Sequence, residues 1–486
     1  MYYNNKILVG KNDKTEVNLL LNMANRHGII TGASGSGKTI TLKVLAESFS
    51  AAGVPVFLVD VKGDLAGMSQ TGTIDEGFQS RLDKLNLESF EVSNFPTTYW
   101  DVYGEKGHPI RTTISKLGSR LLSRMLGLTD AQEGVLAIVF KIAEDENLEI
   151  VDLKDLRAML AYVGEKRKDY TLKYGNVSLQ SIGSIQRSLL TLEQEDGDYF
   201  FGKPALDIKD FTHYDAYKGY AHINILDAVK LFQKPTLYSS FLLWILTELY
   251  NTMPEVGDLD KPKFVLFIDE AHLLFKDIPE YLLQQIIQIV KLIRSKGVGL
   301  YFISQSPSDI PDEILSQLGN RIQHVLRYYT KSDAKAIKAA CDSFRENSEF
   351  DMEETIKTLA TGEAIVSFLD ENGSPSVAEK VTILSPQSKM GTIDHTTRQQ
   401  LIKESYLYNK YENRINEKIT YEKLQKELGS EEEKEIVKKE TKTTTKKSSK
   451  SNKKNPIEKA ATKLTNRTIN TLGNKIGNAI FKGLFK

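Results

Sequence analysis

A short glycine-rich run that ends in a lysine and a threonine is the first group of residues able to do chemistry. It reads Gly32-Ala33-Ser34-Gly35-Ser36-Gly37-Lys38-Thr39. Such glycines let backbone N–H groups turn toward one anion, and a helix that begins there adds partial positive charge. Lys38 can reach the β- and γ-phosphates, while the Thr39 hydroxyl ligates magnesium. The pattern predicts a phosphate-binding loop for a nucleoside triphosphate with Mg²⁺, formed by Gly32, Ala33, Ser34, Gly35, Ser36, Gly37, Lys38, Thr39 and Ile40.

Two adjacent carboxylates follow an apolar run much later in the chain. The run Phe264–Ile268 is typical of a buried strand, and Asp269 and Glu270 come directly after it. Ligands of α/β sheets bind at the carboxyl ends of the strands, so these side chains would face the triphosphate. We expect Asp269 to hold the magnesium shell and Glu270 to polarise the attacking water as a general base. The alternative is an acidic turn that caps the helix after it.

Other polar side chains are candidates for the same site. Gln305 follows the apolar run Gly299–Ser304, which we expect to lie next to the Asp269 strand. It is placed to hydrogen-bond the γ-phosphate or the attacking water, unless it only meets solvent. The carboxylates of Asp60 and Asp64 either contact magnesium or cap a turn.

An arginine is expected to neutralise the charge that develops on the transferred phosphoryl group. Arg321 is the first candidate and Arg294 the second, each acting across a subunit interface. Ordinary salt bridges are the alternative for both.

The elements that position these residues form an α/β pattern. A strand over Ile29–Thr31 enters the glycine loop, and a helix over Lys38–Ala52 follows it, with apolar residues on one face. The run Val54–Val59 is continuously apolar, as expected for a parallel strand covered on both faces. The chain is therefore expected to fold as an α/β core with a mostly parallel sheet and a large α-helical insertion.

The order of these patterns predicts the domain boundaries. Residues 1–109 would hold an N-terminal β-hairpin and the first half of the core, 110–255 the helical insertion, and 256–386 the second half. The remaining segments would be a helical extension (387–430), a lysine-rich disordered linker (431–456) and an amphipathic C-terminal helix (457–486).

Composition narrows the class of protein only modestly. The 64 basic residues balance the 64 acidic ones, so the net charge does not point to nucleic acid. The single cysteine, Cys341, excludes an internal disulfide and a cysteine-based zinc site. Because no apolar stretch approaches the roughly 20 residues of a membrane-spanning helix, we expect a cytoplasmic protein.

Several spans together carry a resemblance to a known family. They are Arg26–Thr39, Val59–Leu65, Phe267–Phe275, Leu292–Gly299, Ser304–Pro311 and Gln317–His324. In these spans the sequence resembles the HerA-like ATPases, and most nearly the YjgR-like bacterial branch of the HerA/FtsK superfamily. The resemblance implies a RecA-like core, ATP bound between the subunits of a hexameric ring, and Lys38, Thr39, Asp269, Glu270 and Gln305 as working residues. It also implies Arg321 as the finger and duplex DNA as the substrate.

Four functions remain in competition. The first is a ring ATPase that translocates or remodels DNA. A nucleotide-gated scaffold, on a membrane or in a defence complex, is the alternative from a different class. A GTPase-type switch is disfavoured because the sequence contains no Asn-Lys-x-Asp motif. A two-lobed helicase is disfavoured because the sequence shows one phosphate loop and one α/β core. The lysine-rich tail fits DNA, anionic lipid, a protein partner or a simple linker.

Overall fold

Three strands that carry long apolar runs form the centre of the sheet. They are β5 (Val56–Asp60), β9 (Phe264–Ile268) and β10 (Val298–Ser304), and every residue of each is buried. In this computed structural model β9 pairs in parallel with β10 on one side and with β5 on the other. A strand between two neighbours with helices on both faces needs apolar side chains on both faces, which explains the unbroken runs. The structure describes residues 1–87, 90–257, 259–275, 278, 280–415 and 420–426.

The sheet continues on both sides of this centre. Its order is β1 (Tyr2–Tyr3), β2 (Lys6–Lys11), β13 (Glu379–Ile383), β12 (Glu363–Ser367), β11 (Asn320–Gln323), β4 (Gly28–Thr31), β10, β9, β5, β8 (Ile223–Asp227), β6 (Thr97–Asp101) and β7 (His108–Pro109), with β3 (Glu16–Leu20) paired to β2. Pairing is antiparallel from β1 through β11 and between β2 and β3, and it is parallel from β11 through β7. The expected mixed α/β fold with a mostly parallel sheet is confirmed.

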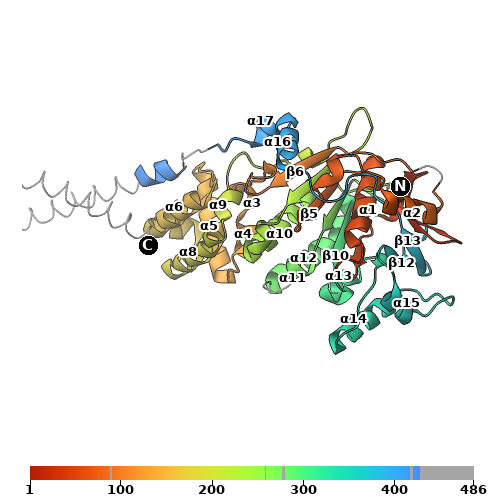
Figure 1. Cartoon of the computed structure of the whole chain (residues 1–486). Helices are drawn as coiled ribbons and strands as arrows, with labels where there is room; N and C mark the ends of the chain where they lie inside the picture. Colours follow the sequence, from red (N-terminus) through yellow and green to blue (C-terminus); the bar gives the residue numbers. More distant parts are fainter. Residues whose placement is uncertain (88–89, 258, 276–277, 279, 416–419, 427–486) are drawn as a thin grey trace, which may run out of the picture. The chain divides into compact units, whose positions relative to one another are not determined.

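Helix α1 (Lys38–Ala51) packs on one face of the sheet. Its Phe49 ring lies 6.2 Å from Phe267 and 5.9 Å from Tyr301, on β9 and β10. On the opposite face, the Phe57 ring of β5 lies 4.7 Å from Phe211. Next to that face, α10 (Pro235–Thr252) and α12 (Glu280–Leu292) pack against each other (Figure 1). Helix α1, which follows the predicted phosphate-binding loop, is therefore held by aromatic packing against the two strands that precede the other candidate residues.

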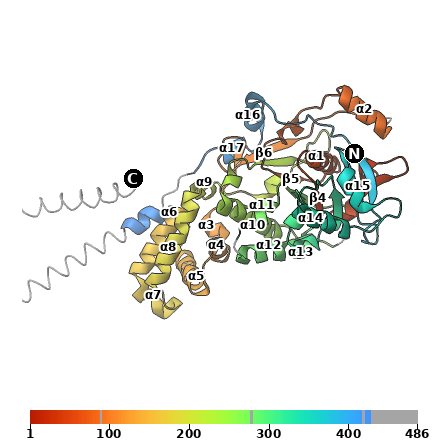
Figure 2. The ribbon, with the colours of Figure 1, turned by 60° about the horizontal axis from the view of Figure 1, so that its bottom comes forward.

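Helices dominate the described chain from residue 114 to residue 200. They are α3 (Ile114–Leu117), α4 (Ser119–Met125), α5 (Asp130–Asp145), α6 (Leu153–Glu165), α7 (Arg167–Tyr174), α8 (Leu179–Gln194) and α9 (Gly197–Phe200). A break at Gly118, whose φ is +81°, separates α3 from α4. Helices α4, α5, α6 and α8 pack together as a group, with α7 beside α6 (Figures 1 and 2).

The range 110–255 is not wholly a helical insertion, because it contains a core strand. Strand β8 pairs in parallel with β5 and with β6. Its sequence is interrupted by Asn224, which hides the apolar pattern. In the fold this amide is fully buried: it donates to the carbonyls of Val56 and Phe211 and accepts from the indole of Trp100. A buried polar group needs hydrogen-bond partners, and here all three lie outside the strand in the sequence. The sequence of β8 alone therefore does not show that Asn224 can be buried in a core strand.

The remaining elements complete the unit formed by Met1–Leu424. They are α2 (Glu76–Leu85), α11 (His272–Phe275), α13 (Asp312–Leu315), α14 (Lys331–Asp342), α15 (Met352–Thr358), α16 (His395–Glu404) and α17 (Tyr408–Tyr411). The expected linker 431–456 and C-terminal helix 457–486 lie outside the described residues. Among the helices that are described, none is long and apolar enough to cross a membrane.

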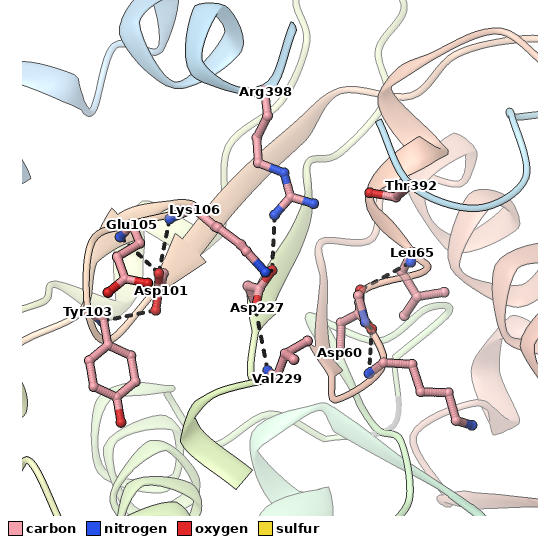
Figure 3. Close-up of polar contacts among 12 residues, drawn as sticks. Asp60, Leu65, Asp101, Tyr103, Glu105, Lys106, Asp227, Val229, Thr392 and Arg398 are labelled. Atoms are coloured by element: carbon pink, nitrogen blue, oxygen red, sulfur yellow. Dashed lines mark hydrogen bonds and ion pairs between the residues drawn. The ribbon is translucent and has the colours of Figure 1, made fainter. Parts of the chain in front are cut away.

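Helix α16 of the predicted C-terminal extension is attached to the carboxyl edge of the sheet. Arg398 donates from Nη1 to Oδ2 of Asp227 at 3.0 Å, at the end of β8 (Figure 3). Lys106 lies 3.3 Å from the same oxygen, and both Arg398 and Asp227 are buried. A buried ion pair requires both partners, so this contact fixes α16 on the core.

Candidate nucleotide-binding site

The glycine loop joins β4 to α1 in a conformation that needs its glycines. The φ angles of Gly32, Gly35 and Gly37 are +153°, +73° and +112°. A Cβ at Gly32 would lie 2.5 Å from Cβ of His324, which no real pair of carbon atoms tolerates. The loop is therefore closed against its neighbours, and the first turn of α1 directs its free backbone N–H groups toward the space inside it.

Lys38 lies inside the curve of this loop. Its side chain is nearly buried, and Nζ donates to the carbonyls of Gly32 at 2.7 Å and Ala33 at 3.0 Å. Burial lowers the pKa of Lys38, as does the nearby charge of Lys62, while Glu270 and Asp269 act in the opposite direction. The ammonium group is therefore poorly solvated and suited to meet an anion.

Ser36 supplies a test of whether a ligand fits here. Its hydroxyl oxygen is buried and has no hydrogen-bond partner among the described residues. A buried hydroxyl without a partner is uncommon and calls for an explanation such as an absent ligand. Thr39 follows on the first turn of α1 and is half-buried. The residues present therefore fit a phosphate group bound by the loop.

Asp269 and Glu270 lie at the same edge of the sheet as the loop. Ile268, the last residue of β9, is level with Phe302 of β10, and Ser304 of β10 is level with Thr31 of β4. The carboxyl ends of β9, β10 and β4 therefore meet. The φ of Glu270 is +47°, a left-handed conformation that non-glycine residues rarely adopt outside functional sites or turns.

The two carboxylates have different proton affinities. Burial raises the pKa of Asp269 to about 6, although Lys62 opposes the shift. Burial also acts to raise the pKa of Glu270, but its hydrogen bond and charge interaction with Lys62 outweigh this and lower it overall. Glu270 is therefore ionised at neutral pH and able to accept a proton.

Gln305 contacts Glu270 directly. Its Nε2 donates to Oε2 of Glu270 at 3.5 Å, a long hydrogen bond, and Nδ1 of His272 lies 3.2 Å from the same oxygen. Strand β10, which ends directly before Gln305, is the neighbour of β9, as the sequence predicts. The structure thus brings Lys38, Asp269, Glu270 and Gln305 to one edge of the sheet.

Two further residues of the site escaped the sequence reasoning. Lys62 places Nζ 2.6 Å from Oε1 of Glu270 and 3.6 Å from Oδ2 of Asp269. His324 contacts the hydroxyl of Thr41 on α1 through Nε2 at 2.8 Å, and burial lowers its pKa to about 4. Lys62 follows the carboxyl end of β5, and His324 follows that of β11. A polar residue after a core strand is the same sequence signal that identified Glu270, and it could have identified these two residues.

Asp60 caps a turn. Its carboxylate accepts from the backbone N–H groups of Lys62, Gly63 and Leu65 at 2.7–3.2 Å. These bonds shape the loop that carries Lys62. Asp64 has one buried carboxylate oxygen without a partner among the described residues. Of the two roles considered for this loop, a magnesium contact and a turn cap, Asp60 has the role of a turn cap.

The two candidate arginines lie together, away from the glycine loop of their own chain. Arg321 is level with Ile29, early in β4, so it lies toward the amino ends of the strands. Arg321 and Arg294 line one cavity of about 370 Å³, together with Arg26 and Lys291. The guanidinium of Arg321 donates to the carbonyls of Leu318, Ser343 and Leu315 at 3.0–3.1 Å. The lining of this cavity is therefore strongly basic.

A glycine loop before a helix, with two carboxylates at the end of a nearby parallel strand, defines the class of P-loop nucleoside triphosphatases. The chain belongs to the HerA-like P-loop ATPases of the HerA/FtsK superfamily. The family model described as "Helicase HerA-like C-terminal" matches residues 5–486.

Individual relatives agree with this assignment. The DNA double-strand break repair helicase HerA of Sulfolobus acidocaldarius is 25% identical over 365 residues, which cover 74% of this chain and 65% of the relative. The protein of the same name from Sulfurisphaera tokodaii is 26% identical, over 74% and 66% of the two chains. The match thus spans about two thirds of each relative. The bacterial conjugative coupling protein TrwBdeltaN70 shares the fold, with a TM-score of 0.50 and 15% identity, over 81% of this chain and 92% of that chain.

Proposed function

We propose that this chain is a Mg²⁺-dependent ATPase that works as a ring-shaped motor on duplex DNA. The observation that carries the catalytic part is the meeting of Lys38, Asp269 and Glu270 at one sheet edge. The DNA part rests on the relatives from Sulfolobus acidocaldarius and Sulfurisphaera tokodaii, which are described as DNA double-strand break repair helicases.

Each residue has a distinct task in this proposal. Lys38 and the N–H groups of the loop bind the phosphates, and Thr39 and Asp269 hold Mg²⁺. When bound, Mg²⁺ supplies positive charge to the phosphate oxygens. Glu270 accepts the proton of the attacking water, and Gln305 orients that water from the neighbouring strand. In this proposal phosphate and water oxygens supply the remaining ligands of Mg²⁺, as is usual for this ion.

The basic cavity is the proposed source of an arginine that acts in trans. It lies toward the amino ends of the strands, so its own chain's loop is out of reach. In a ring with ATP at each interface, Arg321 or Arg294 of one subunit would face the phosphates bound by the next. Charge on the transferred phosphoryl group is stabilised by such an arginine.

Mixing two inactive variants tests this arrangement. Rings of Arg321→Ala alone and of Lys38→Ala alone are expected to be inactive. A 1:1 mixture that exchanges subunits should regain ATPase activity, because roughly a quarter of its interfaces combine an intact lysine with an intact arginine. Since Arg321 also holds three backbone carbonyls, Arg294→Ala is mixed in parallel and the melting temperature of each variant is measured. If the subunits exchange and neither arginine variant regains ATPase activity in the mixture, an arginine finger acting in trans is contradicted.

The function as a whole is tested by measuring ATP hydrolysis with and without duplex DNA, beside the native mass. We expect DNA to accelerate hydrolysis several-fold and the mass to correspond to six chains. ATP hydrolysis that ignores DNA, by a protein that stays monomeric, would refute the DNA motor. The nucleotide-gated scaffold would then be the better account.

A further inference from the structure

Lys62 occupies a place that the catalytic roles above do not use. It projects from the loop after β5, and its ammonium group contacts both carboxylates at the end of β9. The amine is 2.6 Å from Glu270 and 3.6 Å from Asp269, while 42% of the side chain remains exposed. The loop that carries it is fixed by the three hydrogen bonds to Asp60. The contact is therefore built into the fold and is not a chance pairing of two surface groups.

Lys62 supplies one of the two lysine charges that act on Asp269 and Glu270, and Asp64 adds further negative charge beside it. Lys38 and Lys62 provide two positive charges, and Glu270 and Asp269 provide two carboxylates. Each lysine interacts with both carboxylates, and the two lysines also repel each other. Without Lys62, an incoming polyphosphate would meet two carboxylates and a single compensating lysine. Repulsion between like charges in a partly buried site is screened only weakly.

We propose that Lys62 is a built-in counter-cation: it compensates Asp269 and Glu270 when a nucleotide binds without Mg²⁺, and it becomes dispensable when Mg²⁺ is present. This inference rests on the proposed nucleotide site. Lys62 is thus a positioning residue that loosens the dependence of nucleotide binding on the metal ion. It would let the site keep ADP after the metal has left.

The proposal makes a prediction about coupling. A divalent cation bound beside Asp269 supplies the positive charge that Lys62 otherwise provides. Removing Lys62 should therefore weaken nucleotide binding strongly in the absence of Mg²⁺ and little in its presence. An ordinary phosphate-binding lysine would behave differently, because its loss weakens nucleotide binding equally with and without Mg²⁺.

The chain offers a matched control on a neighbouring strand. Lys106 follows β6 at the same edge of the sheet, and its Nζ lies 3.3 Å from the buried Asp227 (Figure 3). Its side chain is 47% exposed, close to the 42% of Lys62. Loss of either lysine therefore leaves a buried carboxylate with one cation fewer, but only Lys62 contacts Asp269 and Glu270.

The test uses the fluorescent ADP analogue mant-ADP, titrated once in EDTA and once in excess Mg²⁺. The quantity compared is the ratio of the dissociation constant in EDTA to that in Mg²⁺. We expect Lys62→Met to raise this ratio about tenfold, because loss of one charge in a partly solvated site weakens nucleotide binding only where Mg²⁺ does not replace it. Lys62→Arg and Lys106→Met should keep the wild-type ratio, and melting temperatures show that each variant is folded.

The possible failures are distinct. The counter-cation proposal is overturned if a folded Lys62→Met variant keeps the wild-type ratio of dissociation constants. This includes the case in which the variant binds mant-ADP more weakly by the same factor in EDTA and in Mg²⁺. Either result leaves the proposed ATPase intact. If the wild-type chain does not bind mant-ADP in either condition, the nucleotide site itself is refuted, and this inference falls with it.

Discussion

Lys38→Ala is expected to remove measurable ATP binding. The lysine is the only loop side chain that brings a full positive charge into the curve of Gly32–Thr39, and burial has already stripped most water from it. Loss of its charge-assisted bonds to phosphate should cost roughly 3 kcal/mol, or about a hundredfold in affinity. Titration with mant-ATP in Mg²⁺ measures the effect.

A second buried lysine on the same helix provides the control. Lys43 is fully buried, and its amine donates to the carbonyl of Lys389, away from the glycine loop. Lys43→Met should lower the melting temperature but preserve ATP binding. Near-wild-type affinity in Lys38→Ala would mean that the loop does not hold the phosphates.

Glu270→Gln should bind ATP and hardly hydrolyse it. The amide is nearly the same size as the carboxylate and keeps an oxygen that can accept from Lys62, but it cannot take a proton from water. Removal of a general base typically costs a factor of about 10² to 10⁴ in rate. Single-turnover hydrolysis, measured beside mant-ATP affinity, separates the chemical step from binding.

Glu363→Gln is the matched control for this variant. Glu363 begins β12, and its side chain accepts from the backbone N–H of Ala360 outside the site. Its backbone carbonyl, which contacts His324, is untouched by the substitution. This variant should hydrolyse ATP at the wild-type rate. Turnover in Glu270→Gln within a few-fold of wild type would exclude Glu270 as the base.

Local sequence was sufficient for the residues whose position follows from one strand or one loop. The glycine loop is such a case, because the strand before it, its own spacing and the helix after it are contiguous in the sequence, from Gly28 to Ala51. Asp269, Glu270 and Gln305 were also predictable. Each directly follows a buried parallel strand, and such strands present their carboxyl ends at the same edge.

Tertiary structure decided whatever depends on a distant partner. Asn224 makes β8 look unlike a core strand, and only its bonds to Val56, Phe211 and Trp100 explain its burial. The pairing of Lys62 with Glu270 joins loops about 200 residues apart, which no local pattern encodes. The same holds for the cavity that joins Arg321 and Arg294. Sequence periodicity reports which face of an element is buried, whereas charge pairing depends on which elements the chain brings together.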